Sequence, residues 1–351
     1  MKPTSNKPPL FILQTAKDRG ISGVQTILSS NLAALNRPVV LYYFGKPVLT
    51  LFTSPNILLK AHTLQKFLKL LFELFKGRYA SIITQGPIPI DSLFLIVGLI
   101  TETPVIVHRH VIQKDLQWKP AKNKCFFWLD KFTLHLAHKI LYSTKSACEL
   151  NQTIYALKNG GVITNGIEIA KHPPKITVKR VAMVAQLQSH KGWDLYLQAI
   201  QVLSQKHPHI EFLGFGDGPL KTTLLPKFAA LKNFKWMENK VPMAPYYKDI
   251  DVLVLPSNRE GLSFACVEGL SYGCVLVITP VKGSEELLAN KNGTLIPFED
   301  SMALAQGIEQ YILNPILFSE QSKKSIELAH NSFNLITVAK QLNQILDEVE
   351  S

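Results

Sequence analysis

The chain has 351 residues, a length typical of two domains of similar size. Hydrophobic residues make up 46% and charged residues 18%, and this balance excludes a disordered or low-complexity protein. The formal charge of +12 is uneven, because residues 1–174 contain 21 Lys and Arg against 8 Asp and Glu, whereas residues 175–351 contain 17 against 18. A basic half joined to a neutral half indicates that one domain meets an anionic surface, either a membrane or a polyanion.

The cysteines and the apolar segments exclude two further classes of protein. The cysteines are Cys125, Cys148, Cys266 and Cys274. They show no metal-ligand spacing and are too few for a disulfide scaffold, so we interpret them as reduced core thiols. The apolar stretch 10–13 is too short for a signal-peptide core, and no apolar run reaches the ~18 residues of a spanning helix. We therefore expect a cytoplasmic protein without a transmembrane helix.

Short apolar runs alternate with longer helix-like segments along the first half, a pattern typical of parallel sheets covered by helices on both faces. The predicted strands are 10–16, 39–44, 80–84, 105–109 and 139–143. The predicted helices are 22–35, 57–76, 90–101 and 123–138.

A polar stretch containing Pro173 and Pro174 then indicates a linker. After it, strand-like and helix-like segments alternate again. The predicted strands are 180–187, 210–214, 252–256 and 275–279, and the predicted helices are 192–206, 219–231, 263–272 and 301–313. We predict an α/β fold of two Rossmann-like domains, 1–172 and 173–334, followed by a C-terminal helix, 335–351. Ligands bind beyond the carboxyl ends of such strands, so we expect two domains facing each other across a cleft that holds the chemistry.

Two glutamates follow the strand predicted at 252–256. Glu260 falls in the loop after this strand, and Glu268 falls inside an otherwise apolar helix. Burying an unpaired carboxylate is costly, and the paired hydroxyls of a ribose or hexose satisfy its acceptor oxygens well. The alternative is that Glu268 faces solvent, which is the commoner position for a lone Glu on a helix.

Three other loops follow strands of the second half. Lys191 lies at the start of a predicted helix, where a cation is unfavourable unless an anion such as a diphosphate binds beside it. Glycines at 214, 216 and 218 and the segment 283–286 occupy the corresponding loops. Such glycines allow close backbone approach to phosphates or sugars, although they are more often simple turns.

Together these segments resemble the retaining nucleotide-sugar glycosyltransferases of family four, whose two Rossmann domains form the GT-B fold. The resemblance rests on residues 185–192, 214–218, 256–268 and 283–286. It implies a donor site made of Gln186, Lys191, Gly216, Glu260, Gly261, Leu262, Ser263, Phe264 and Glu268. Glu268 would bind the ribose hydroxyls, and Glu260 with the amides of 261–264 would bind the transferred sugar. The family usually has Arg in place of Gln186, so Lys191 is expected to hold the diphosphate alone.

The N-terminal half resembles the family's acceptor domain less closely. The segment 18–24 looks like the glycine loop after the first strand, with Gly20, Ser22 and Gly23 next to the acceptor or a phosphate. The segment 103–110 looks like the strand that ends in the active-site histidine. Either His108 or His110 fits that role, since alternation places both on the same strand face, and the other interpretation is an ordinary core histidine.

The resemblance implies a retaining hexosyltransferase that moves a sugar from a nucleotide diphosphate sugar to a glycan or lipid-linked acceptor. Its place would be cell-surface glycan or lipopolysaccharide biosynthesis, with Lys191, Glu260 and one of the two histidines as catalytic residues. We expect no cofactor and no tightly bound metal, because Lys191 and helix amides would neutralise the leaving diphosphate. A nucleotide-sugar epimerase of the same fold is the alternative, and it would need no acceptor. The basic pI alone suggests nucleic-acid binding, but no recognised motif supports it.

Two basic and apolar segments lie in the first half. Residues 57–76 carry Lys60, Lys66, Lys69 and Lys76 among Leu and Phe, and residues 114–131 mix lysines with aromatic side chains. We expect the first segment to form a single helix with its lysines along one face. A structural helix and an interfacial helix on anionic lipid fit this pattern about equally, and the second segment favours the interfacial one. We therefore predict peripheral docking on the inner face of a membrane.

Overall fold

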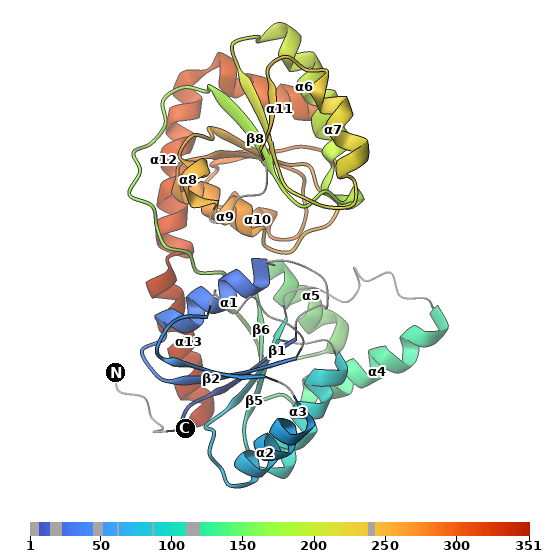
Figure 1. The fold of residues 1–351 in the computed structure, drawn as a ribbon, viewed down its shortest axis with the longest axis vertical. Coiled ribbons are helices and arrows are strands. Elements are labelled where there is room, and N and C mark those ends of the chain that lie inside the picture. Colours follow the sequence, from blue (N-terminus) through green and yellow to red (C-terminus); the bar gives the residue numbers. More distant parts are fainter. Residues whose placement is uncertain are drawn as a thin grey trace. The chain divides into compact units, whose positions relative to one another are not determined.

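The computed structural model describes residues 7–14, 23–44, 52–61, 63–85, 88–109, 120–237 and 243–351. The chain divides into two compact units, and Figure 1 follows it from one to the other. The first unit contains residues 1–166 together with 335–351, and the second contains residues 167–334. The C-terminal helix is thus part of the first unit, and the division falls after Gly166 where the sequence suggested 172.

The described part of the first unit contains one seven-stranded parallel sheet in the order β3-β2-β1-β4-β5-β6-β7. Its strands are β1 (Leu10–Gln14), β2 (Val39–Phe44), β3 (Ile57–Ala61), β4 (Ile82–Gln85), β5 (Val105–Arg109), β6 (Lys139–Tyr142) and β7 (Gly160–Val162). Its helices are α1 (Gly23–Ala34), α2 (Leu64–Phe75), α3 (Ile88–Ile100), α4 (Pro120–Leu136), α5 (Lys145–Tyr155) and α13 (Leu335–Glu350).

Two hydrophobic cores cover the two faces of this sheet. One core includes residues of α2, α3, α4 and α5, and the other includes residues of α1 and α13. Figure 1 shows α13 beside α1, although these helices lie at opposite ends of the sequence. The buried side chain of Arg37 holds this arrangement, because it pairs with Asp347 at 3.2 Å and with Glu350 at 2.6 Å.

The single helix predicted at 57–76 is wrong. Residues 57–61 form the edge strand β3, paired with β2, and the helix α2 begins only at Leu64. Thr63 is the N-cap residue of α2, and its hydroxyl accepts a hydrogen bond from the amide of Lys66 at 3.2 Å. Lys60 therefore lies on a strand, where its ammonium pairs with the Glu73 carboxylate at 2.8 Å.

In the second unit, the described residues form a six-stranded parallel sheet in the order β10-β9-β8-β11-β12-β13. Its strands are β8 (Arg180–Val184), β9 (Glu211–Phe215), β10 (Phe234–Met237), β11 (Val252–Leu255), β12 (Val275–Ile278) and β13 (Gly293–Leu295). Its helices are α6 (Trp193–Lys206), α7 (Lys221–Ala229), α8 (Ala244–Tyr247), α9 (Phe264–Ser271), α10 (Ser284–Leu287), α11 (Ser301–Leu313) and α12 (Pro315–Ser332).

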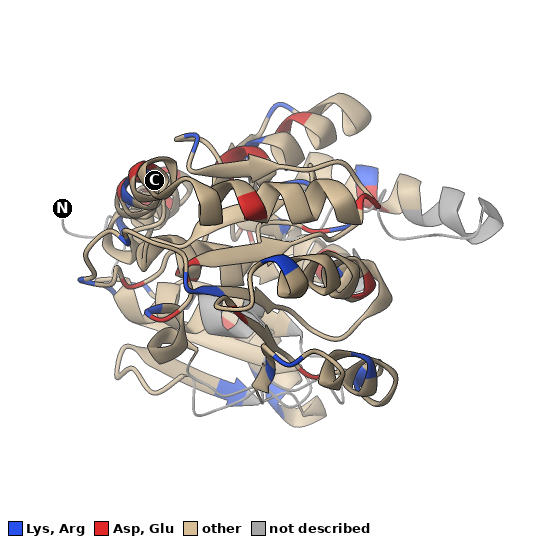
Figure 2. Ribbon diagram, turned by 90° about the horizontal axis from the view of Figure 1, so that it is seen from above, with Lys and Arg blue, Asp and Glu red and all other residues tan. Residues whose placement is uncertain are grey.

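The central strands of this sheet are fully buried, as expected for a parallel sheet with helices on both faces. One core gathers residues of α6, α7 and α11, and the other gathers residues of α8, α9, α10 and α12. Residues 175–351 contain 17 basic and 18 acidic residues, so this half of the chain is nearly neutral, and Figure 2 marks the described Lys, Arg, Asp and Glu residues along the ribbon. The fold of two Rossmann-like α/β units is confirmed.

Two predictions about whole-chain properties can be compared with the structure. Cys148, Cys266 and Cys274 are buried free thiols, as predicted, whereas the side chain of Cys125 lies outside the described residues. Within the described ranges, no helix has both the length and the apolar character that crossing a bilayer requires.

Candidate functional site

An ion pair joins two residues predicted for the donor site. Lys191 ends a short 3-10 turn, Ser189–Lys191, after β8, and Glu260 lies in the loop after β11. The Lys191 ammonium is 2.5 Å from the Glu260 carboxylate, and their side chains are 17% and 10% exposed. The hydroxyl of Ser257 donates a second hydrogen bond to the same carboxylate oxygen at 2.9 Å. The structure thus brings the predicted cation and carboxylate together at the carboxyl ends of adjacent strands.

A glycine allows these two loops to approach. Gly192 has φ +80°, and a Cβ at this position would lie 2.1 Å from the carbonyl oxygen of Pro256. The amide of Asn258 donates to the carbonyl of His190 at 2.9 Å and fixes the same contact. Only glycine fits here, both by conformation and by space. The expectation that Lys191 opens a helix is wrong, since α6 begins at Trp193, after this glycine.

Two residues that we did not predict complete the surroundings of the ion pair. Burial lowers the pKa of the His190 imidazole, the neighbouring cations Lys191 and Arg259 lower it further, and the Glu260 carboxylate opposes this shift. Ser257 is fully buried, and its hydroxyl orients Glu260. Its position directly before the loop, three residues from Glu260, was the available signal in the sequence.

The second predicted carboxylate, Glu268, lies on α9 and is partly buried, so it does not simply face solvent. Burial raises its pKa to about 7, and a hydrogen bond from the hydroxyl of Tyr247 opposes that shift. Tyr247 is completely buried on α8, and sequence reasoning did not identify it. One acceptor position of Glu268 is therefore taken by the protein itself.

The segment between these glutamates contains the other predicted donor residues. Ser263 occupies the N-cap position of α9 without a side-chain capping bond, and α9 begins at Phe264. Leu262 is buried, whereas Gly261, Ser263 and Phe264 are partly buried. Gly283, with φ +83°, packs its Cα against the carbonyl of Gly261, where a Cβ would come within 2.6 Å. The loop after β12 thus supports the loop that precedes α9.

The glycines after β9 have a structural use. A Cβ on Gly216 would lie 2.0 Å from the carbonyl oxygen of Ala185, and the amide of Ala185 donates to the carbonyl of Phe215 at 3.0 Å. The close approach permitted by Gly216 is therefore made to protein backbone. Gln186, where the family usually has Arg, has an exposed side chain that accepts a hydrogen bond from the Gln188 amide group at 3.1 Å.

One Asp-x-Asp triplet, Asp249-Ile250-Asp251, lies at the amino-terminal end of β11, whereas Glu260 follows the carboxyl end of this strand. The Asp251 carboxylate accepts hydrogen bonds from the amides of Lys179 and Arg180 at 2.7 and 2.8 Å, and Asp249 pairs with Arg180 at 3.4 Å. These contacts give the triplet a structural role. Over the described ranges, no group of three or more His, Cys, Asp or Glu side chains is placed to hold a metal ion.

In the first unit, His108 lies at the carboxyl end of β5 and is partly buried. Its Nδ1 is 3.3 Å from the side-chain nitrogen of Gln85, at the end of the neighbouring strand β4. The next residue, Arg109, pairs with the buried carboxylates of Asp91 at 3.0 Å and Asp130 at 2.7 Å.

The remaining predicted residues of the first unit are His110, Gly20, Ser22 and Gly23. His110, Gly20 and Ser22 lie outside the described residues, and Gly23 is the first residue of α1. Their predicted roles stay predictions.

Comparison with known proteins follows the division into units. Residues 178–314, which are most of the second unit, match the family model described as glycosyl transferases group 1. An uncharacterized glycosyltransferase of Haemophilus influenzae is 28% identical over 200 residues, which is 55% of this chain and 54% of that protein. The chain thus spans about half the length of this relative.

Two further proteins are similar over both units. The UDP-Gal:α-D-GlcNAc-diphosphoundecaprenol α-1,3-galactosyltransferase of Escherichia coli is 24% identical over 309 residues, covering 79% of this chain and 77% of that protein. Crystal structures of HepE from Anabaena with UDP and with UDP-glucose match with TM-scores of 0.82 and 0.79 at 16% and 17% identity. They cover 97% of this chain and 100% and 99% of HepE, and this likeness concerns the fold.

Proposed function

From the premise that this chain has the GT-B fold and that its second unit is a glycosyl transferase group 1 domain, we propose that the protein transfers a sugar from a nucleoside diphosphate sugar to a glycan acceptor in polysaccharide biosynthesis. The observation that carries the proposal is the Lys191–Glu260 pair, supported by Ser257 at the carboxyl ends of β8 and β11. This is the edge of a parallel sheet where ligands bind.

The ion pair offers a way to bind a charged donor. A diphosphate oxygen can replace the Glu260 carboxylate on the Lys191 ammonium, since both are anionic acceptors of the same hydrogen bonds. Glu260 would then be free to accept hydrogen bonds from hydroxyls of the sugar. Lys191 would stabilise the negative charge that develops on the diphosphate as the bond to the sugar breaks.

The nucleoside would bind beside α9. Glu268 is partly buried and has Tyr247 as a protein partner, which leaves acceptor positions for the two ribose hydroxyls. The first amides of α9 would meet the sugar or a phosphate oxygen, because amides of a helix's first turn have no acceptor within the helix. We propose uridine as the base, since HepE binds UDP and the name of the E. coli relative specifies UDP-Gal.

The first unit would bind the acceptor, with His108 or His110 next to the reacting sugar. We propose a lipid-linked acceptor, as the name of the E. coli relative describes for that enzyme. Such an acceptor would place the reaction at the cytoplasmic face of a membrane.

Titration calorimetry with UDP, GDP, ADP and dTDP tests the donor assignment directly. We expect UDP to bind and the others to bind more weakly, because base selection depends on differential contacts in one pocket. Absence of binding by every nucleotide to the folded protein would contradict the proposal. Transfer from UDP-galactose or UDP-glucose to a polyprenyl diphosphate sugar, with no turnover of the donor without acceptor, would distinguish transfer from epimerisation.

We also propose that transfer retains the anomeric configuration of the donor. The proposal follows from the similarity of residues 185–192 and 256–268 to the retaining family. Proton NMR of the product formed within the first minutes would give the coupling constant of the new anomeric proton. A product of inverted configuration would contradict it.

Finally, we propose that transfer requires no tightly bound metal, with Lys191 neutralising the leaving diphosphate. Turnover should then persist after dialysis against EDTA. Complete loss of turnover in EDTA that manganese restores would contradict this proposal.

A further inference from the structure

The outer faces of α2, α3 and α4 carry large apolar side chains that are exposed to solvent. These side chains are Leu64, Leu68, Phe72 and Phe75 on α2, Leu93, Ile96, Leu99 and Ile100 on α3, and Trp128, Leu129 and Phe132 on α4. The inner faces of the same helices pack in one core on the sheet. We call the exposed side chains of these three helices the outer apolar surface.

On α2 the exposed apolar residues form a continuous stripe. Leu64, Leu68, Phe72 and Phe75 follow one another at spacings of four, four and three, and they are 57–72% exposed. Such spacing places side chains on one face of a helix. The buried residues Leu70 and Leu74 lie on another face of the helix and pack in the core. The exposed stripe is therefore a second apolar face, which does not contribute to the core.

The three helices belong to a single surface. The ring of Phe67 on α2 meets the ring of Phe94 on α3 edge to face at 6.4 Å, and α3 packs along α4. Figure 1 shows the three helices next to one another on one face of the sheet. In the second unit, exposed large apolar residues on helices are few and scattered, namely Met302, Leu313 and Ile316. Exposed large apolar side chains gathered on neighbouring helices in this way indicate an interaction site.

The charges on this surface have one sign. Each acidic residue of α2, α3 and α4 is buried and paired with a cation: Glu73 with Lys60, and both Asp91 and Asp130 with Arg109. The exposed charges at the described positions of these helices are therefore lysines. Two lysines lie against aromatic rings of the surface: Lys76, the C-cap residue of α2, is 4.4 Å from the Phe72 ring centre, and the half-buried Lys131 is 5.4 Å from that of Trp128.

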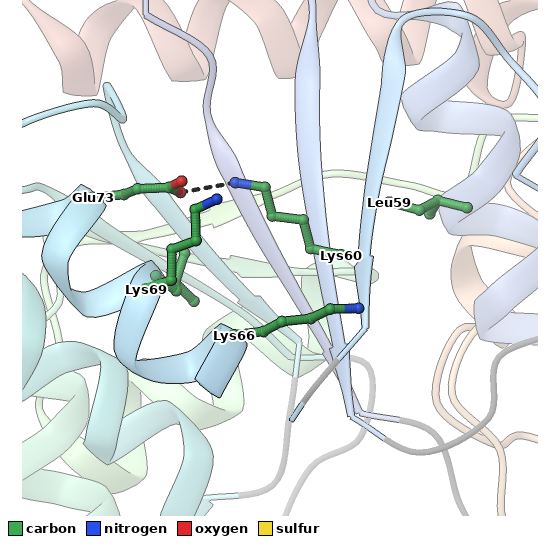
Figure 3. A pocket seen from close by; sticks show the side chains of 6 residues that line it. Leu59, Lys60, Lys66, Lys69 and Glu73 are labelled. Carbon is green, nitrogen blue, oxygen red and sulfur yellow. Dashed lines mark hydrogen bonds and ion pairs between the residues drawn. The ribbon is translucent and has the colours of Figure 1, made fainter. Parts of the chain in front are cut away.

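A cavity of about 200 Å³ between β3 and α2 adds a cationic pocket beside the apolar stripe. Lys60, Lys66, Lys69 and Glu73 line it with two leucines. Figure 3 shows the ammonium groups of Lys60 and Lys69 near the Glu73 carboxylate, with Lys66 extending from α2 toward β3. Lys60 already pairs with Glu73 and bonds the hydroxyl of Tyr79 at 2.8 Å. Three lysines and one glutamate line the pocket, which therefore has a surplus of positive charge.

We propose that the outer apolar surface docks on a bilayer containing anionic phospholipid, with its Leu, Phe and Trp side chains at the acyl boundary and Lys66 and Lys69 on a headgroup phosphate. A protein partner would need acidic groups facing these lysines and a matching apolar surface, whereas an anionic membrane supplies both over any contour. The proposal replaces the single helix expected from the sequence with three helices, and it gives Lys60 no role in headgroup binding, because its ammonium already pairs with Glu73. It goes beyond the proposed transfer reaction, since binding to vesicles requires no donor and no turnover.

Sedimentation of the full chain with vesicles tests the proposal. We expect binding to vesicles of phosphatidylcholine with 30% phosphatidylglycerol, weaker binding as salt increases, and weaker but measurable binding to phosphatidylcholine alone. Lys66→Gln with Lys69→Gln should lower the partition coefficient about tenfold or more on the anionic vesicles, because each cation near an anionic leaflet contributes to binding. The matched control is Lys227→Gln with Lys323→Gln, two exposed lysines of the second unit, which should leave binding unchanged.

The apolar contribution has its own variant pair. Leu68→Ser with Phe72→Ser should lower binding at high salt, where insertion of apolar side chains dominates, by more than tenfold. Leu313→Ser with Ile316→Ser is the matched control on the second unit. We expect each variant to fold, because all substituted side chains are exposed. Thermal unfolding of each variant checks this.

Three results would overturn the proposal. The first is no sedimentation of the wild type with anionic vesicles at low salt. The second is unchanged binding by the Leu68→Ser, Phe72→Ser protein. The third is a concentration-dependent dimer in sedimentation velocity that this variant abolishes, which would make a second copy the occupant of the surface. Failure of UDP to bind would contradict the proposed transfer reaction only. The vesicle experiments need no donor, so their results would still test the membrane proposal.

Discussion

In both units, the first strand lies inside the sheet with the second and third strands on one side of it and the fourth, fifth and sixth on the other. The units differ in the use of their charged side chains. In the first unit, Arg37 and Arg109 each hold two carboxylates in buried ion pairs, and the exposed surface of three helices is apolar and cationic. In the second unit, Glu260 and Glu268 lie beyond the carboxyl end of β11 and are only partly buried.

The comparison shows that one strand order supports two kinds of surface. Carboxylates that neutralise a buried arginine stabilise their unit, and they are not available to bind a ligand. Carboxylates beyond the strand ends are accessible to a ligand, and they make that part of the unit less stable than it would be with neutral side chains. The following changes test this contrast in order of expected size.

Arg37→Ala should have the largest effect, because it leaves Asp347 and Glu350, whose side chain is fully buried, without their cation. Breaking a buried ion pair costs about 3 to 5 kcal/mol, so the free energy of unfolding of the first unit should fall by that amount in urea titrations. The matched control is Arg180→Ala in the second unit, where the guanidinium is 41% exposed. It should cost at most about 1 kcal/mol. Equal losses in both variants would remove the contrast between the units.

Lys191→Met should lower turnover about 100- to 1,000-fold at saturating donor, because it removes the cation that would stabilise the leaving diphosphate. Lys227→Met, which disrupts only an exposed pair with Asp194, is the control in the same unit. The double variant Lys191→Met, Glu260→Gln removes both charges together and should regain stability without regaining turnover. Turnover near the wild-type value in Lys191→Met would exclude a role for this ammonium in the reaction.

Glu268→Ala should weaken UDP binding by about 1 to 3 kcal/mol, measured by calorimetry, since the ribose hydroxyls would lose their acceptor. Tyr247→Phe separates this effect from packing, because it removes the protein's hydrogen bond to Glu268 and keeps the carboxylate. We expect that variant to bind UDP with little change. An unchanged affinity in folded Glu268→Ala would move the nucleoside away from α9.

The pH dependence of stability should show the smallest effect. Burial raises the pKa of Glu268 to about 7, so between its ordinary pKa of 4.5 and pH 7 the native state binds this proton more tightly than the unfolded state. The stability of the wild type should therefore fall as the pH rises through this window and level off above it. Relative to Glu268→Gln, which does not titrate, we expect a loss of about 1 to 2 kcal/mol, less than full burial would give. Parallel curves for the two proteins would show that this carboxyl is not shifted.

The sequence allowed the two-unit fold to be predicted, and it also indicated which loops of the second unit follow its strands, because each of these signals is local. Lys191 and Glu260 each follow a predicted buried strand. In a parallel sheet, loops that follow strands lie at the same end of the sheet. The partners Ser257 and Tyr247 were not predicted, since their roles depend on distances between separate loops. Gly216 was expected next to a ligand. In the structure, its lack of a Cβ allows close contact with the carbonyl oxygen of Ala185.

The errors in the first unit have a physical cause as well. Residues 57–76 have no Gly or Pro, and their Leu and Lys content satisfies a helical pattern from end to end. Thr63 was the signal for a new helix start, as its capping hydroxyl shows. The docking of α13 on α1 was not predictable, because nothing local in residues 335–350 specifies a partner about 300 residues earlier.

That docking has a consequence for how the protein is made. The second unit is one continuous stretch, 167–334, and it can fold as soon as it has left the ribosome. The first unit is synthesised earlier but waits, since the core beneath α1 stays open and Arg37 has no carboxylate until residues 335–350 are synthesised. Order of synthesis and order of completion are therefore opposite for the two units. A nascent chain stalled before residue 335 would expose the apolar side chains of α1 to chaperones and proteases.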